Sequence, residues 1–206
     1  MKAVLISIQP KWVEKIVSGQ KTIEVRKTAP KLETPFKCYI YCTKHKEKLL
    51  EVLHKGDYCY GVKYDSDKPE FIKTFDDTSL IGYWGIGKVI GEFVCDYILT
   101  YEPTKAWNYG GKEIHYLNST LDDATCLLYD EIEDYGNGKT LYGWHISDLK
   151  IYNRPKELIE FYKPCPNIDE DYRCYYCDCL ADSDYGGYCT NYLTRPPQSW
   201  QYIEEN

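Results

Sequence analysis

The sequence predicts a mostly β fold of the α+β class, built as a small β-barrel with short flanking helices. Aromatic residues make up 16% of the chain, with 22 Tyr and 5 Trp, and broad rings pack well on a pleated sheet. Short apolar or alternating runs of strand length recur between turn residues. Residues 82–91 contain four glycines, which permit the tight curvature that barrel corners require.

The first fifty residues predict two strands around a helix, followed by a third strand. The apolar run 3–8 predicts a buried strand. Residues 10–19 predict a two-turn amphipathic helix, with Pro at its start and Gly at its end. Residues 22–26 and 36–43 alternate between apolar and polar side chains, as half-buried strands do.

The middle of the chain predicts a helix and further strands. Apart from the long bent strand and the loop, each segment is predicted from its apolar spacing. The expected elements are a helix at 46–54, strands at 58–64 and 71–75, one long bent strand over 82–98, a loop over 100–120, and a helix at 121–134 capped by Asp122 or Asp123.

The last part predicts a strand at 140–152, a short helix at 155–162 and a closing strand at 198–203. Composition changes at Pro164, after which cysteines and acidic residues replace the apolar periodicity. The sequence therefore predicts a barrel over 1–163, a Cys-rich insertion over 164–192, and a return to the barrel over 193–206.

Charge is distributed unevenly along the chain. The net charge is -7, yet residues 1–50 alone carry +7 and the remainder -14. This asymmetry indicates either a local basic face on an acidic body or a solvated Lys-rich surface. No apolar run approaches the roughly 20 residues that span a bilayer, and the opening residues do not form a signal peptide. A cytoplasmic protein is therefore expected, with its ten cysteines reduced, metal-bound or buried.

A charged cluster stands out at the start of the chain. Lys21, Glu24 and Arg26 lie within six residues, and Thr22, Glu24 and Arg26 share one strand face. Such a face must pair internally, lie in solvent, or line a cleft, because burying unpaired charge is costly. Arg26 suits bidentate binding of phosphate or carboxylate, and Lys21 offers a point charge. An exposed, salt-bridged strand is the competing interpretation.

Several motifs resemble those of ASCH-domain proteins, in particular those of Firmicutes and their phages. The G-x-K-T-x-E-x-R core at 19–26 is the most characteristic. The segments that carry the resemblance, in order, are 7–12 (SIQPKW), 19–27 (GQKTIEVRK), 87–93 (GKVIGEF), 142–147 (YGWHIS) and 195–200 (RPPQSW).

This resemblance implies a PUA-like barrel with a cleft between the barrel and the helix after the first strand. It implies a binding module for RNA or a modified nucleotide, and the expected ligand-binding residues are Lys21, Thr22, Glu24, Arg26 and Trp12. Aromatic faces and Arg planes are what unstacked bases bind.

Two other functions stay open. Some relatives resemble amidohydrolases or nucleases, for which Lys21 and Glu24 would be the catalytic pair. However, Glu24 stands where the amidohydrolase resemblance requires a Thr, and a carboxylate cannot replace a hydroxyl nucleophile without a change of mechanism. The other alternative is a phage-encoded protein that binds a host protein through its acidic C-terminal part.

Five cysteines fall within residues 165–189 and predict a structural zinc site, with unliganded thiols as the alternative. Cys174 and Cys177 form a C-x-x-C pair that Cys165 and Cys189 would complete, with Cys179 as an alternative ligand. The remaining thiols lie in apolar segments and are expected to be buried and inert: Cys38, Cys42, Cys59, Cys95 and Cys126.

Overall fold

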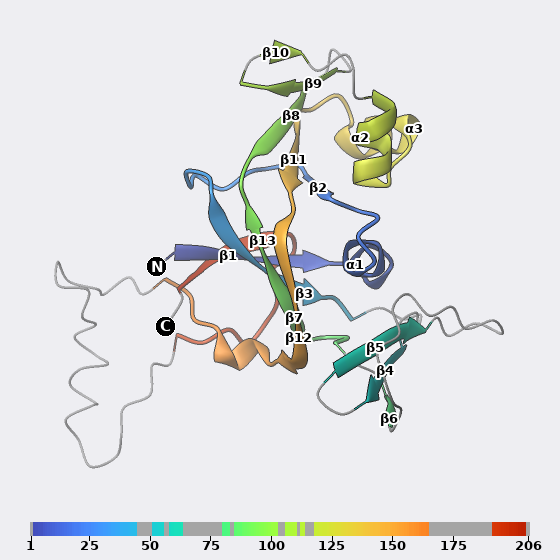
Figure 1. Cartoon of the computed structure of the whole chain (residues 1–206). Helices are drawn as coiled ribbons and strands as arrows, with labels where there is room; N and C mark the ends of the chain where they lie inside the picture. Colours follow the sequence, from blue (N-terminus) through green and yellow to red (C-terminus); the bar gives the residue numbers. More distant parts are fainter. Residues whose placement is uncertain are drawn as a thin grey trace.

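The computed structural model describes residues 2–44, 51–55, 58–63, 80–82, 85–102, 106–110, 112–113, 118–164 and 191–204. Two five-stranded sheets form the body, a third sheet has three strands, and short helices lie around them (Figure 1). The predicted α+β class, rich in β structure, is confirmed.

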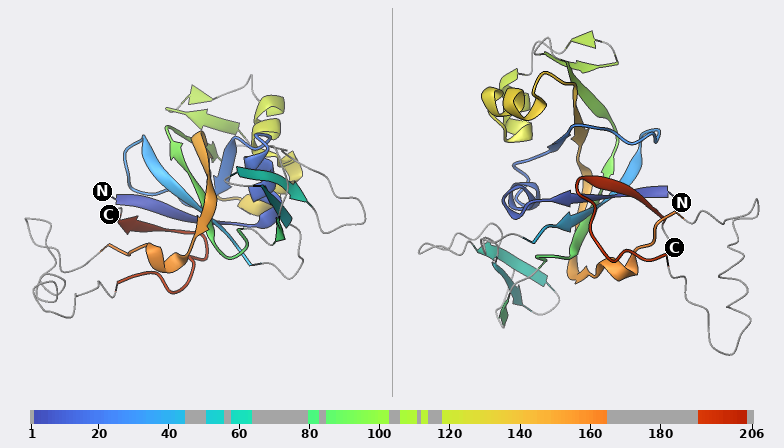
Figure 2. Two further views of the ribbon diagram at one scale, coloured as in Figure 1. Left: turned by 60° about the horizontal axis from the view of Figure 1, so that its bottom comes forward. Right: turned by 180° about the vertical axis from the view of Figure 1, so that it is seen from behind.

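The first sheet is built around β1, whose apolar run is buried from Ala3 to Ile8. In spatial order β12-β7-β3-β1-β13, β1 pairs in parallel with β3 and antiparallel with β13. The expected closing strand is thus the partner of β1, and the two chain ends lie side by side (Figure 2). The bounds are β1 (Lys2–Ile8), β3 (Phe36–Cys42), β7 (Val89–Cys95), β12 (Ser147–Lys156) and β13 (Trp200–Glu204).

The second sheet carries β2, the strand with the charged cluster. Its order is β10-β9-β8-β11-β2. Ile23 and Val25 join one apolar cluster with Leu99 and Ile132, as the alternation of 22–26 predicts. The bounds are β2 (Ile23–Arg26), β8 (Ile98–Glu102), β9 (Ala106–Tyr109), β10 (Lys112–Glu113) and β11 (Leu141–His145).

The helices follow the strands that position them. Helix α1 (Pro10–Val17) begins directly after β1 with Pro at its first position, as predicted. Helices α2 (Asn118–Thr125) and α3 (Tyr129–Gly136) lie beside the second sheet (Figures 1 and 2), and a 3-10 helix spans Leu158–Glu160.

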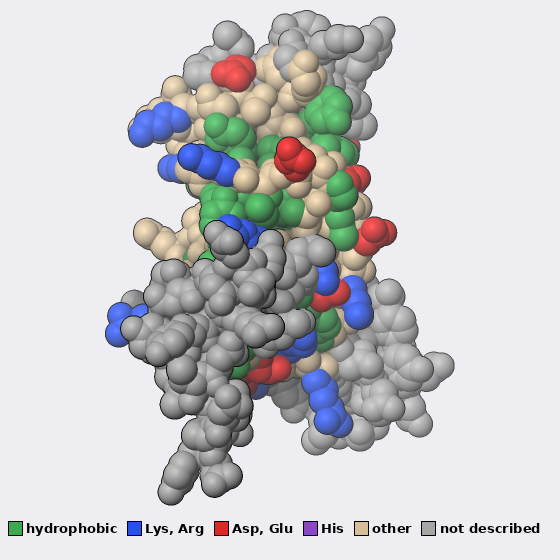
Figure 3. All heavy atoms as spheres, turned by 90° about the vertical axis from the view of Figure 1, so that its left-hand side faces the viewer, with side chains coloured by type: hydrophobic (Ala, Val, Ile, Leu, Met, Phe, Trp, Pro, Cys, Tyr) green, Lys and Arg blue, Asp and Glu red, His purple; other side chains and the backbone are tan. Residues whose placement is uncertain are grey.

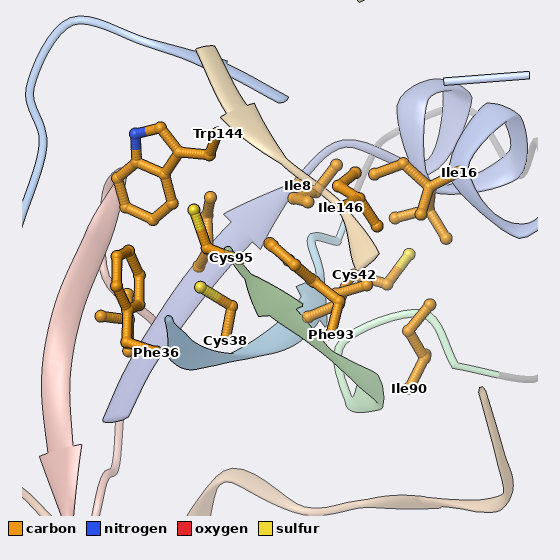
Figure 4. Close-up of a cluster of buried hydrophobic side chains, with 14 residues drawn as sticks. Ile8, Ile16, Phe36, Cys38, Cys42, Ile90, Phe93, Cys95, Trp144 and Ile146 are labelled. Atoms are coloured by element: carbon orange, nitrogen blue, oxygen red, sulfur yellow. The ribbon is translucent and has the colours of Figure 1, made fainter. Parts of the chain in front are cut away.

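The main core is packed between α1 and the first sheet and is closed by Trp144 of β11 (Figure 4). The Trp144 ring is fully buried and meets Phe36 edge to face at 6.0 Å. Cys38, Cys42 and Cys95 are buried in this core, and burial raises the pKa of the Cys42 and Cys95 thiols to about 12. These three thiols are buried, as expected; the side chain of Cys59 lies outside the described part of the structure.

Several predicted elements are wrong in extent because turns interrupt them. The long strand over 82–98 is a turn at 85–88 and two strands, β7 and β8, and the strand over 140–152 is β11 and β12. The helix over 121–134 is two helices separated by Cys126, which has a φ of 53° and is half-buried rather than buried. Consequently Asp122 and Asp123 lie inside α2 and do not cap it.

Other predictions fail because strand pairing overrides local propensity. Residues 51–54, expected in a helix, form β4 (Glu51–Lys55), which pairs with β5 (Tyr58–Lys63) and β6 (Leu80–Gly82). The expected loop over 100–120 contains β9 and β10, and the expected helix over 155–162 shrinks to the 3-10 turn. The strand expected at 71–75 lies outside the described residues.

The expected barrel is not closed. Within the described ranges, strand pairing gives separate open sheets, and no ladder joins the first sheet to the second. The Cys-rich stretch 165–190 also lies outside the described residues, so the division into barrel and insertion stays a prediction.

Candidate functional site

A cleft of about 430 Å³ lies where β1 and β3 end. These two strands are parallel, so their carboxyl ends meet at one edge of the sheet, with α1 leading away from it. Parts of α1, β2, α3 and the segment before β13 complete the walls. The lining residues are Ser7, Gln9, Lys11, Trp12, Lys21, Glu24, Val25, Arg26, Thr43, Leu127, Tyr135 and Gln198.

The charged side chains of the cluster form one buried ion-pair network. Lys21, Glu24 and Arg26 are 2%, 5% and 9% exposed. One Glu24 oxygen, Oε1, lies 2.9 Å from Arg26 Nη2, and the other, Oε2, lies 3.5 Å from Lys21 Nζ. The interpretation as an exposed, salt-bridged strand is therefore wrong. Helix α2 contacts β2, and Ile132 of α3 joins the apolar cluster of Ile23 and Val25, which the local sequence does not reveal.

Lys21 is anchored at the end of α2. Its Nζ donates a hydrogen bond of 2.5 Å to the backbone carbonyl of Thr125, the last residue of that helix. A cation at a helix C-terminus is favourable, because the last carbonyls carry partial negative charge. Burial nevertheless lowers the pKa of Lys21, and the Glu24 carboxylate opposes that effect in part.

Arg26 ties β2 to the end of β1. Its Nη2 donates a 2.6 Å hydrogen bond to the backbone carbonyl of Ser7, while Nη1 lies 3.5 Å from Ser199 Oγ. The Ser7 hydroxyl in turn donates to the carbonyl of Pro197 at 2.7 Å. The segment before β13 is thereby held against the cleft.

Two atoms of the network have no hydrogen-bond partner among the described residues. They are Glu24 Oε2 and Arg26 Nε, and both atoms are buried. Buried polar atoms in native proteins are nearly always satisfied by protein, water or ligand. Both residues line the cleft, but these two atoms themselves lie beneath its surface.

Aromatic rings border the charged floor. The half-buried Trp12 has the Lys21 ammonium 5.1 Å and the Lys11 ammonium 4.5 Å from its ring centroid. Tyr135, on α3, is 37% exposed and lies beneath the Lys27 ammonium at 4.7 Å. The cleft therefore combines buried charge with two partly exposed aromatic faces.

Four of the five predicted ligand-binding residues line this cleft: Trp12, Lys21, Glu24 and Arg26. Thr22 is not among its described lining residues; its backbone instead bonds to Ala124 and Ile146. Sequence reasoning missed Gln9 and Lys11, although the SIQPKW motif contains them. It missed Tyr135 because only the packing of α3 brings this ring to the cleft.

The cleft lining contains some of the basic residues expected to form a face. The cleft is lined by three basic side chains and one acidic one. On the face shown in Figure 3, by contrast, Lys and Arg are interspersed with Asp and Glu. Positive charge thus predominates in the cleft lining.

The predicted zinc ligands cannot be placed. Cys165, Cys174, Cys177, Cys179 and Cys189 all lie outside the described residues, so the zinc site stays a prediction. Within the part of the chain that the structure describes, no helix has the length and apolar character to cross a membrane.

Comparison with known proteins identifies a family. A family model described as the ASCH domain matches residues 6–177. Crystal structures of an ASCH protein from Zymomonas mobilis are similar over 98% of this chain at 16% identity. The alignment with a serine-to-alanine mutant of that protein covers 89% of the mutant's chain, with a TM-score of 0.49. The alignment with the unmutated protein covers 88% of its chain, with a TM-score of 0.45. No curated protein matches the sequence.

Proposed function

The chain belongs to the ASCH domain family, whose domain is PUA-like, and on this premise we propose that it binds RNA or a nucleotide in the cleft around Lys21, Glu24 and Arg26. The observation that carries the proposal is that the buried ion-pair network of Lys21, Glu24 and Arg26 lines a cleft together with Lys11, Trp12 and Tyr135. A concave site with aromatic and apolar walls and a few charged groups is typical of ligand-binding pockets.

The chemistry of the cleft suits a nucleotide. The Glu24 carboxylate can accept from an exocyclic amine or ring N–H of a base, and the Arg26 guanidinium can donate to a carbonyl or phosphate oxygen. Trp12 or Tyr135 offers a ring face for a base. Lys11 is exposed at the rim and can reach a phosphate without a large cost of desolvation.

A direct test measures binding of short RNAs, short DNAs and free nucleotides by fluorescence titration of the full chain. Wild type is expected to bind RNA or nucleotide saturably, with an affinity that falls as salt rises, because phosphate contacts release counterions. Lys11→Ala is expected to weaken binding several-fold. This variant leaves the buried network intact and should fold normally.

Lys15→Ala is the matched control, since it removes the same charge from the same helix but lies outside the lining of the cleft. Equal effects of the two changes would mean that only general charge matters. If neither nucleic acid nor nucleotide binds at low salt, the proposal fails, and a protein partner becomes the leading alternative.

Hydrolysis is the second candidate, and the lowered pKa of Lys21 favours it. Burial lowers the pKa of Lys21, and a lowered pKa makes an amine more readily available as a base or nucleophile than an exposed lysine. However, Lys21 is ion-paired with Glu24 and bonded to a helix end. Turnover of an acylated nucleoside or of RNA by wild type, lost in Lys21→Met, would support catalysis over binding alone.

A further inference from the structure

A second cleft adjoins the first and suggests how long the ligand is. It has a volume of about 560 Å³, and Thr43 lines both. We propose that the protein binds a strand of at least two nucleotides, one in each cleft, with the linking phosphate near Thr43. This inference rests on the proposed function and adds a second subsite to it.

Two structural segments border both clefts. Thr43 directly follows β3, and its backbone N–H bonds to Ile8 at the end of β1 at 2.9 Å. In the segment before β13, Gln198 lines the first cleft and Pro196 the second. An extended ligand can therefore follow both segments from one cleft into the other.

Charge in the second cleft is compatible with a phosphate. Lys44 lines it, exposed and one residue beyond Thr43, with its side chain along Gly87. A Cβ built at Gly87 would lie 2.7 Å from Lys44 Cε, so the lysine side chain runs directly against this glycine. The carboxylate of the cleft, Glu157, is already paired with Lys88 at 2.7 Å, which reduces its repulsion of an anion.

The rest of the second cleft offers apolar surface for a base. Leu158, Ile159 and Pro196 line it, and Ile159 is 59% exposed. An apolar surface beside an exposed lysine matches a nucleotide, which has a flat base and a charged phosphate. Each cleft also falls in the volume range of small-ligand pockets, roughly 300–1,000 Å³.

The test is a length series of mixed-sequence RNA: mononucleotides, dinucleotides and tetranucleotides with 5′-phosphates, titrated against the full chain. The dinucleotide should bind at least about fivefold more tightly than the mononucleotide, because burial of roughly 40 Å² of apolar surface in the second cleft contributes about 1 kcal/mol. A nucleoside diphosphate, which adds charge but no second base, should not reproduce the gain.

Lys44→Ala and Ile159→Glu should each remove most of this gain and leave mononucleotide affinity unchanged. Lys31→Ala, an exposed lysine outside both clefts, is the matched control and should change neither. If mononucleotides bind and the longer RNAs bind with the same affinity, the second subsite is overturned, whereas the proposed function is still supported. Absence of all binding would instead overturn both.

Discussion

The paired strands β2 and β11 each contribute to one group of paired polar side chains, and the two groups differ in burial. In their register Trp144 lies opposite Glu24, and His145 opposite Ile23. Glu24 belongs to the buried network with Lys21 and Arg26, whereas His145 pairs with Asp96 across 2.6 Å, with side chains 25% and 43% exposed. Neighbouring pairs in the β2–β11 ladder thus belong to two different groups. Glu24 is in a buried ion-pair network, and His145 is in a partly exposed pair with Asp96.

Covering elements explain the difference. Lys21, an ion-pair partner of Glu24, reaches the end of α2, and side chains of α1, α3 and the segment between α2 and α3 line the cleft beside Glu24. His145 instead stacks on Tyr97 at 4.3 Å, with the rings within 12° of parallel. Water screens the second pair and not the first, so the two pairs should differ severalfold in their effect on stability.

The largest effect is expected from Glu24→Gln. This change keeps the shape of the side chain but leaves two buried cations, Lys21 and Arg26, without a carboxylate. Removal of one member of a buried ionic group costs about 3–5 kcal/mol. Urea unfolding should therefore show a loss of that order. Glu33→Gln, at an exposed position, should cost under about 0.5 kcal/mol. A loss below 1 kcal/mol at Glu24 would contradict the burial argument.

Arg26→Lys should have the next largest effect. Lysine keeps the charge but cannot reproduce the planar fork that reaches the Ser7 carbonyl and Glu24 together. A loss of about 1–3 kcal/mol in unfolding free energy is expected, as for a buried acceptor left unpaired. The matched control is Arg154→Lys, at an exposed position. Equal stability of the two variants would show that charge alone matters at position 26.

Lys21→Met should cost on the order of 1 kcal/mol at neutral pH, because loss of the bond to Thr125 is offset by relief of desolvation. Its pH dependence has a definite sign. Since the folded pKa lies below the unfolded value of 10.5, the unfolded chain binds more protons between the two. Wild type should therefore gain stability relative to Lys21→Met as pH rises toward 10.5. A difference that shrinks over that range would contradict the lowered pKa.

Asp96→Asn should have the smallest effect, within about 1 kcal/mol. Burial alone would raise the pKa of Asp96, but hydrogen bonds, chiefly from His145, outweigh it and lower the pKa below 3.8. The stabilisation by this carboxylate is thus present above pH 3.8 and lost as pH falls through the folded value. Unfolding curves of wild type and variant should converge in acid. A loss of unfolding free energy as large as that of Glu24→Gln would contradict the expectation that the exposed pair contributes less to stability than the buried network.

Much of the fold was predictable where one local signal dominates. The apolar run of β1, the Pro-initiated α1 and the alternation of β2 were all correctly located. Predictions failed at interruptions such as Cys126 and Ile146, because a change of chain direction depends on what each segment packs against. For the site, the sequence indicated four lining residues but not Tyr135 or Gln198, which distant elements bring to the cleft.

The sequence by itself determined the family, the α+β class and the charged residues of β2, because motifs and periodicity are local properties. Only the tertiary structure decided that Lys21, Glu24 and Arg26 are buried and linked. It also decided that the end of α2 holds Lys21, and that the two clefts meet at Thr43. Burial and adjacency depend on elements far apart in the chain, and these set the free energy of a buried charge.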